Sequence, residues 1–234
     1  MGPHYLHTFG YYYLAPPRDN RRINLKRQSI IIDANSFMYF IYDQILNEAE
    51  RINRNQDLTN ILFDYNGYWD YLREVLIKFK KNCSSVLVVF DGVYKQNANR
   101  RPDPQRTSSS RYADFNNKQH QLPSLFRHVF IDNLREMDLD VYVARGEADP
   151  MIVRLAQDRE AYIVAADSDY NLYELPMGYV PLKFFDLKRL EGPLYQMTDF
   201  FTGMDSRGVS LWASLIKYEF VGLTKLHVRR FRLE

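Results

Sequence analysis

The chain has 234 residues, of which 46% are hydrophobic and 15% aromatic, and its formal net charge is +2 at pH 7. The hydrophobic fraction is ample for a folded core, and no run approaches the twenty apolar residues of a membrane-spanning helix. Residues 1–6 lack the basic and apolar regions of a signal peptide, so we expect an intracellular protein, nuclear or cytoplasmic, without a membrane partner. Cys83 is the single cysteine, which excludes an internal disulfide and a zinc–cysteine cluster.

Between residues 29 and 166, apolar β-type segments alternate with helical patterns. The strands are predicted at 29–33, 85–92, 140–144 and 161–166, and the helices after Asp33 and at 68–81, 123–137 and 150–159. Continuous apolar, β-branched runs are typical of parallel strands that are buried on both faces. The alternation therefore predicts an α/β fold, with a parallel central sheet flanked by helices. Asn35 or Ser36 is expected to cap the first of these helices.

The remaining segments complete the expected domain organisation. Residues 1–28 form an N-terminal segment with a basic end, 29–182 form the α/β domain, and 183–234 form a partly helical extension of it, with helices at 195–203 and 209–221. Between 170 and 182 the sequence predicts a short strand, a turn at Gly178 and a second strand.

Residues 93–122 form a basic insertion that is too long for an ordinary connection. Its basic residues, with only Asp103 and Asp114 against them, are Lys95, Arg100, Arg101, Arg106, Arg111 and Lys118. The segment is either a solvated loop or a surface that contacts a polyanionic substrate, and the sequence leaves both interpretations open.

Each predicted strand delivers carboxylates at its C-terminal end or just beyond it. The six acids are Asp33, Asp91, Glu147, Asp149, Asp167 and Asp169. A single aspartate at a strand end is usually a turn former or a helix cap, but equivalent acids on several strands meet at one edge of a parallel sheet. Because like charges raise each other's pKa, a divalent cation is the usual partner of such a cluster.

Hard carboxylate ligands favour Mg²⁺ or Mn²⁺ over zinc. Two such ions would activate water and stabilise the leaving oxygen in phosphodiester hydrolysis. The sequence holds no His-x-x-x-His, no Gly-x-Ser-x-Gly and no Gly-x-x-x-x-Gly-Lys. Zinc-protease, serine-hydrolase and P-loop chemistry therefore find no support.

The ordered acidic motifs resemble those of the XPG/flap endonuclease superfamily, which has a PIN-like fold. They are Asp33 after three isoleucines, Val89-Phe90-Asp91-Gly92, Gly146-Glu147-Ala148-Asp149 and Ala166-Asp167-Ser168-Asp169. The run from Ala166 to Leu182, with its Gly178-Tyr179-Val180-Pro181-Leu182 segment, resembles the asteroid branch in particular. The resemblance spans roughly residues 29–182.

This resemblance implies that all six acids are catalytic metal ligands, direct or through water, for Mg²⁺ or Mn²⁺, with two ions in an active enzyme. It makes residues 93–122 the counterpart of the arch that handles flap or single-stranded nucleic acid. The phosphate contacts expected there are Lys95, Arg100, Arg101, Arg106 and Arg111.

The chain also departs from the family pattern. Tyr5 precedes Leu6 where the family has Met-Gly-x-x-Gly-Leu, and Gly222-Leu223-Thr224 lacks the acid of a later Gly-x-Asp motif. The C-terminal helical DNA-binding module is expected to be missing or truncated, as in a shortened gene product. Two hypotheses follow: a structure-specific, metal-dependent nuclease acting on DNA or RNA, or a non-catalytic asteroid-type protein that uses the fold for binding or signalling.

Overall fold

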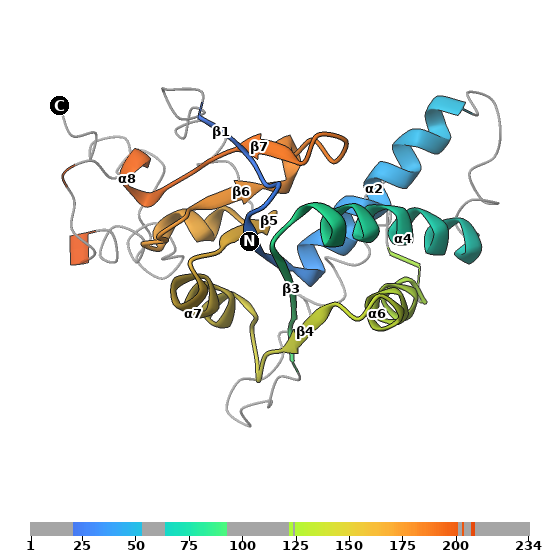
Figure 1. Cartoon of the computed structure of the whole chain (residues 1–234), viewed down its shortest axis with the longest axis horizontal. Coiled ribbons are helices and arrows are strands. Elements are labelled where there is room, and N and C mark those ends of the chain that lie inside the picture. The colour runs from blue at the N-terminus through green and yellow to red at the C-terminus, as the bar shows by residue number, and fades with distance from the viewer. Residues whose placement is uncertain are drawn as a thin grey trace, which may run out of the picture.

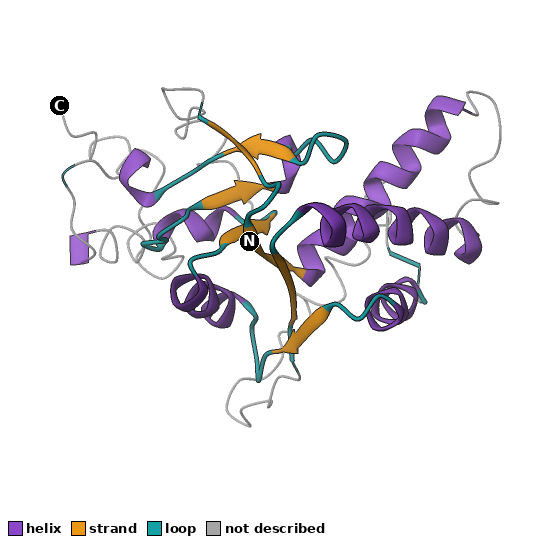
Figure 2. Ribbon diagram, in the orientation of Figure 1, coloured by secondary structure: helices purple, strands orange, loops and turns teal. Residues whose placement is uncertain are grey.

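The computed structural model describes residues 21–52, 64–92, 122–123, 125–200, 203 and 207–208. In these ranges the chain forms a five-stranded, wholly parallel sheet with helices on both faces, which confirms the predicted α/β class (Figures 1 and 2). The sheet order is β4-β3-β2-β5-β6. Its strands are β2 (Ser29–Asp33), β3 (Ser85–Phe90), β4 (Asp140–Val143), β5 (Tyr162–Ala165) and β6 (Tyr179–Pro181).

Three helices cover one face of the sheet and a fourth covers the other (Figure 1). The first three are α2 (Ala34–Ile52), α4 (Tyr65–Asn82) and α6 (Phe126–Glu136), and the fourth is α7 (Asp149–Arg159). Side chains of β2 alternate between these faces: Ile30 and Ile32 join the core of the three-helix face, and Ile31 joins that of α7. Burial on both faces explains the uninterrupted apolar sequence of β2, β3 and β5. In contrast, β4 lies at the edge of the sheet and is exposed along its length, although its sequence predicted a buried strand.

Aromatic rings fill much of the core on the three-helix face. Phe37 of α2 is fully buried, and its ring lies 5.8 Å from that of Phe79 and 6.0 Å from that of Phe130, centroid to centroid. These contacts join α2, α4 and α6. Aromatic pairs stabilise a fold by more than their buried area alone accounts for, so Phe37 stabilises the packing of three helices on the sheet.

Two strands outside the main sheet were not predicted. β1 (Arg22–Asn24) and β7 (Glu191–Pro193) pair antiparallel, with Ile23 opposite Gly192. Arg21 and Asp199 form an ion pair beside them. Each strand has three residues and no apolar alternation, so the sequence carries no periodic signal for either.

The strand predicted between residues 170 and 175 is wrong. The chain forms a 3₁₀ helix, η1 (Ser168–Leu172), because the Asp167 carboxylate accepts a hydrogen bond from the Asp169 N–H and caps it. β6 therefore pairs in parallel with β5 instead of forming a hairpin. Gly178 does turn the chain, with a φ of 96° that favours glycine.

The other elements follow the prediction closely. The short helices η2 (Leu182–Phe184) and α8 (Met197–Phe200) complete the described elements, and α8 falls within the helix expected at 195–203. The helix expected at 209–221 lies outside the described residues, and the division into 1–28, 29–182 and 183–234 stays a prediction. No helix in the described ranges is both long enough and apolar enough to cross a membrane.

Replacing Phe37 by alanine should lower the free energy of unfolding by about 3–5 kcal/mol, because the change opens a cavity between three helices. Tyr39 is the matched control, since it lies on the same helix and is 53% exposed. Its replacement by alanine should cost no more than about 0.5 kcal/mol. Urea denaturation of both variants measures the difference, and equal losses would contradict the packing role of Phe37.

Candidate functional site

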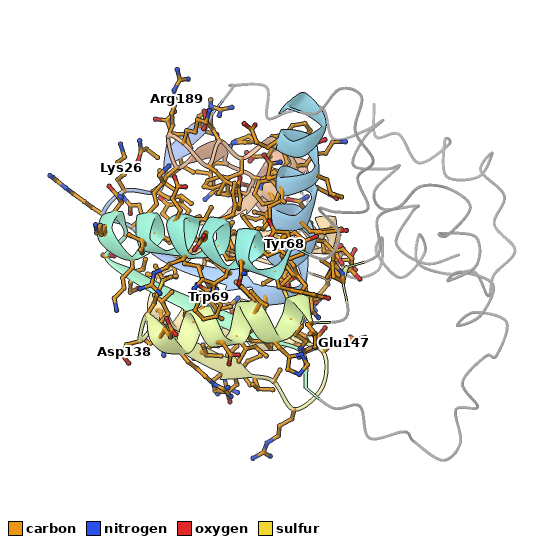
Figure 3. All side chains as sticks on the ribbon, turned by 90° about the vertical axis from the view of Figure 1, so that its right-hand side faces the viewer. Lys26, Tyr68, Trp69, Asp138, Glu147 and Arg189 are labelled. Carbon is orange, nitrogen blue, oxygen red and sulfur yellow. The ribbon has the colours of Figure 1, made fainter. Side chains whose placement is uncertain are left out.

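The six predicted acids all lie at the C-terminal edge of four adjacent strands. Asp33 ends β2, and Asp91 follows β3 directly. Glu147 lies between β4 and α7, Asp149 opens α7, and Asp167 and Asp169 follow β5. Figure 3 shows Glu147 at the opposite end of the described structure from Lys26 and Asp138, which precede β2 and β4. The parallel sheet thus brings the acids to one end of the molecule.

Asp33 is the most enclosed of the six, with 7% of its surface exposed. Its Oδ2 accepts a hydrogen bond of 2.6 Å from the Ser36 hydroxyl, and its Oδ1 accepts from the backbone N–H of Asn35 at 3.0 Å. Asp33 itself therefore caps α2, which corrects the expectation that Asn35 or Ser36 would do so. Burial, outweighing the Ser36 hydrogen bonds and helped by Asp149 and Asp91, raises the pKa of Asp33 to about 6.

Asp91 is held between two neighbouring motifs. Its Oδ1 accepts a hydrogen bond of 2.6 Å from the Ala148 N–H, and its Oδ2 accepts one from the Asn35 side-chain amide. The next residue, Gly92, donates its N–H to the Gly146 carbonyl at 2.9 Å. A Cβ on Gly92 would lie 1.7 Å from the Ala144 oxygen. Only glycine therefore lets the chain after β3 approach the chain after β4 this closely.

Asp149 is the electrostatic centre of the group. Burial raises its pKa most, a hydrogen bond from the Tyr170 hydroxyl lowers it, and Asp169, Asp91 and Glu147 raise it further. The Tyr170 hydroxyl donates to Asp149 Oδ1 at 2.7 Å. None of the described groups that most affect the pKa of Asp149 or of Asp33 is a lysine or an arginine. The charged groups with the largest effects on these two pKa values are therefore all carboxylates.

The Asp167–Asp169 pair belongs to the same electrostatic group. Asp167 is among the charges that raise the pKa of Tyr170 and of Tyr179, and Asp33 contributes to both. Both tyrosines are buried, at 1% and 2% exposure. The buried rings of Tyr170 and Tyr179 are thus close enough to acids that follow β2 and β5 for these charges to affect the pKa of both hydroxyls.

The chemistry of these donors fits hard divalent cations, because six carboxylates from four strands supply oxygen ligands and excess negative charge. In the part of the chain that the structure describes, no three His, Cys, Asp or Glu side chains converge closely enough to enclose one ion. Instead, Asp33, Asp91 and Asp149 turn oxygens toward protein donors. Ligation would require these side chains to exchange protein hydrogen bonds for a cation.

Sequence reasoning missed the side chains that hold the acids. Asn35 and Ser36 were expected as caps, and Tyr170 was expected only as part of a strand. Their signal was proximity to the acidic motifs, since each lies within three residues of Asp33 or Asp167. Their partners could not be predicted, because Asn35 and Tyr170 bond to acids 56 and 21 residues away in the chain.

Basic residues also lie near this edge in the described ranges, among them Arg145, two residues before Glu147, and Arg127. Arg127, in the first turn of α6, places its guanidinium carbon 5.3 Å from the ring centroid of Phe90, the residue before Asp91. In Figure 3, α6 spans the molecule between the Glu147 end, where it begins, and the Asp138 end, where it finishes. No described carboxylate forms an ion pair with Arg127. The predicted phosphate contacts Lys95, Arg100, Arg101, Arg106 and Arg111, and also Thr224, lie outside the described residues.

No protein-family model matches the chain, and no curated protein matches it. Among solved structures, the chain is similar to a T5 5′-exonuclease with divalent metal ions (zinc) bound, at 16% sequence identity and a TM-score of 0.44. The alignment covers 81% of this chain and 65% of the exonuclease chain. A likeness at this level carries no argument about function.

The pKa of Asp33 predicts a pH dependence of stability in metal-free buffer. Because the folded state raises this pKa from 3.8 to about 6, it binds the proton more tightly than the unfolded state. The free energy of unfolding should therefore fall as pH rises between these values, by about 3 kcal/mol from this group, and level off above them. Asp33→Asn should remove most of that decline.

Denaturant titrations in EDTA across this range measure the effect. Asp132→Asn is the control, since Asp132 is exposed on α6 and its ion pair among the described residues is with Arg135. This control should reproduce the wild-type decline. A wild-type stability that rises through the same window would show that Asp33 is better solvated than its burial indicates.

Proposed function

We propose that the protein is an asteroid-type, divalent-metal-dependent, structure-specific nuclease that acts on DNA or RNA phosphodiesters. The observation that carries the proposal is that six acids follow the C-terminal ends of four adjacent parallel strands. Carboxylates that repel one another in a partly buried cluster need a cationic partner, and no described basic side chain supplies one for Asp33 or Asp149. The order of the acidic motifs along the chain supports the same class.

The residues that would hold Mg²⁺ or Mn²⁺ are Asp33, Asp91, Glu147, Asp149, Asp167 and Asp169, with two ions in the active form. When bound, the ions supply an activated water and stabilise the charge that develops on the leaving oxygen. Other residues of the chain orient the ligands through hydrogen bonds: Asn35 and the Ala148 N–H orient Asp91, and Ser36 orients Asp33. These hydrogen bonds tie ligands on different strands into one rigid group.

A second candidate is a non-catalytic asteroid-type protein that uses the fold for binding or signalling. It is favoured by the hydrogen bonds from protein donors that occupy oxygens of Asp33, Asp91 and Asp149. In this role the carboxylates would serve as buried structural acceptors, and cleavage would not be expected. The two candidates therefore differ in whether a cation binds at all.

Purified protein should cleave flap or single-stranded oligonucleotides in Mg²⁺ or Mn²⁺, and Asp149→Asn should reduce the rate by at least about 100-fold, because a charged ligand is lost. Asp132→Asn, an exposed acid on α6, should retain the wild-type rate. Cleavage that persists unchanged in Asp149→Asn would point to a contaminating nuclease and contradict the proposal.

A thermal titration with Mg²⁺ separates the two candidates. A cation that binds only the folded state stabilises it by about 2.7 kcal/mol at a concentration 100 times its Kd. A rise in Tm for the wild type that is absent in Asp149→Asn supports the nuclease. An unchanged Tm at all Mg²⁺ concentrations favours the non-catalytic candidate.

For nucleic-acid contact, we propose that Arg127 contacts a phosphate near the acids. Its side chain is held on the Phe90 ring and has no described carboxylate partner. In an Asp149→Asn background, which prevents cleavage, Arg127→Ala should weaken binding of a single-stranded oligonucleotide. The plot of log association constant against log salt concentration should become shallower, with a slope about 1 less negative, if one phosphate contact is lost.

Arg135→Ala is the matched control, because Arg135 lies in the last turn of the same helix and already pairs with Asp132. It should leave the salt dependence unchanged. Fluorescence anisotropy at several salt concentrations measures both variants. Equal effects of the two substitutions would show a general charge effect instead of a contact at the site.

A further inference from the structure

Three segments of the chain bring basic residues together at the end of the molecule remote from the acids. Residues 22–27, 78–81 and 183–189 each carry three lysines or arginines, and Asp186 is the one acid within these ranges. In Figure 3, Lys26 and Arg189 lie on the side of the molecule opposite Glu147. We call the surface formed by the three segments the basic face.

The three segments lie side by side in the fold although they are far apart in the sequence. The Arg27 N–H donates to the Asn82 carbonyl at 2.6 Å, which joins the turn before β2 to the end of α4. The rings of Phe79 and Phe185 stack with their centroids 6.0 Å apart, which joins α4 to the third segment. Backbone bonds and core packing therefore hold the basic face together against the repulsion between its charges.

Described carboxylates neutralise little of the charge on the basic face. Asp186 pairs with Arg189, whose Nε lies 3.9 Å from its Oδ2. Lys26, Lys81 and Lys188 are exposed, and no described carboxylate forms an ion pair with any of them. The dipole of α4 favours lysines in its last turn, but Lys26 and Lys188 do not lie in a helix. A concentrated field of one sign attracts a polyanion.

An exposed aromatic ring lies among these charges. Phe184 is 52% exposed, and the Lys183 ammonium nitrogen lies 5.6 Å from its ring centroid. No other large hydrophobic side chain of the three segments is exposed. A single ring buries little apolar area in a lipid bilayer, where amphipathic surfaces insert several apolar side chains. Cations beside an exposed ring are the combination that binds single-stranded nucleic acid, because phosphates contact the cations while a base stacks on the ring.

We propose that the basic face is a nucleic-acid surface, separate from the acidic edge, that binds single-stranded DNA or RNA. Phosphates of the strand contact its lysines and arginines, and one base stacks on Phe184. The surface lies at the opposite end of the molecule from the acids, so this binding requires no divalent cation. It therefore does not depend on the proposed nuclease activity, and its contacts with phosphates and a ring face carry little sequence information.

The first test measures the charge contribution by fluorescence anisotropy with oligothymidylate in EDTA at several salt concentrations. The variant combines Lys26→Gln, Lys81→Gln and Lys188→Gln, which neutralises one residue of each segment. On a single strand each phosphate contact contributes about 0.7 to the slope of log association constant against log salt concentration. The slope should therefore be about 2 less negative in this variant.

The matched control also removes three positive charges, but from exposed arginines that already form ion pairs. It combines Arg73→Gln, Arg135→Gln and Arg154→Gln, which lie on three different helices. The control should retain the wild-type slope. Equal slopes in the two triple variants would show a general effect of net charge and would overturn the proposal.

The second test measures stacking with Phe184→Ala. Affinity for oligothymidylate should fall by at least about fivefold, the lower end of the effect of losing one stacked base, while the salt slope stays unchanged because no charge is lost. Affinity for an abasic oligomer of equal length should not change. Tyr39→Ala is the control, since Tyr39 is 53% exposed on α2 and should affect neither probe.

Two further outcomes would overturn the assignment to nucleic acid. One is equal loss of affinity for the abasic oligomer in Phe184→Ala, which would show that the ring serves the fold instead of a base. The other is binding to phosphatidylserine vesicles without binding to oligothymidylate. Absence of cleavage or of a response to Mg²⁺ would contradict the proposed nuclease and leave this inference standing, because both tests are made in EDTA.

Discussion

Repulsion between carboxylates at one end of a parallel sheet is the constraint on which the rest of this structure depends. Parallel strands point their C-terminal ends the same way, and here four adjacent strands deliver acids to that edge. Burial raises the pKa of Asp33 and of Asp149, and neighbouring acids raise both further. The apolar core on both faces of the sheet supplies the free energy that holds these charges together.

The hydrogen bonds around the acids connect the strands instead of serving each strand separately. Asn35, at the start of α2, reaches the acid after β3, and the Ala148 N–H before α7 reaches the same acid. Tyr170, after β5, reaches Asp149. Gly92 allows the close backbone approach that brings two of these motifs together. The positions of the acids and the order of the sheet are therefore set by the same contacts.

The sequence was sufficient for the elements whose pattern is local. Apolar runs predicted β2, β3, β4 and β5, and the strand–helix alternation predicted a parallel sheet, so the common edge of the acids followed from topology. The sequence was insufficient for elements whose pairing partners are distant in the chain or whose pattern spans only a few residues. The β1–β7 pair has three residues per strand and joins segments about 170 residues apart, and the 3₁₀ helix at Ser168 depends on a cap formed by Asp167. Tyr170 was misassigned for that reason.

Protein donors, protons and cations compete for the same carboxylate oxygens at this edge. A proton neutralises Asp33 below a pKa of about 6, and the Ser36 hydroxyl already stabilises the ionised form. A cation must therefore displace protons in mildly acidic solution and rearrange hydrogen bonds at neutral pH, and both costs reduce its affinity. Both oxygens of Asp33 and both oxygens of Asp91 already accept hydrogen bonds, so a cation would have to share or displace these donors.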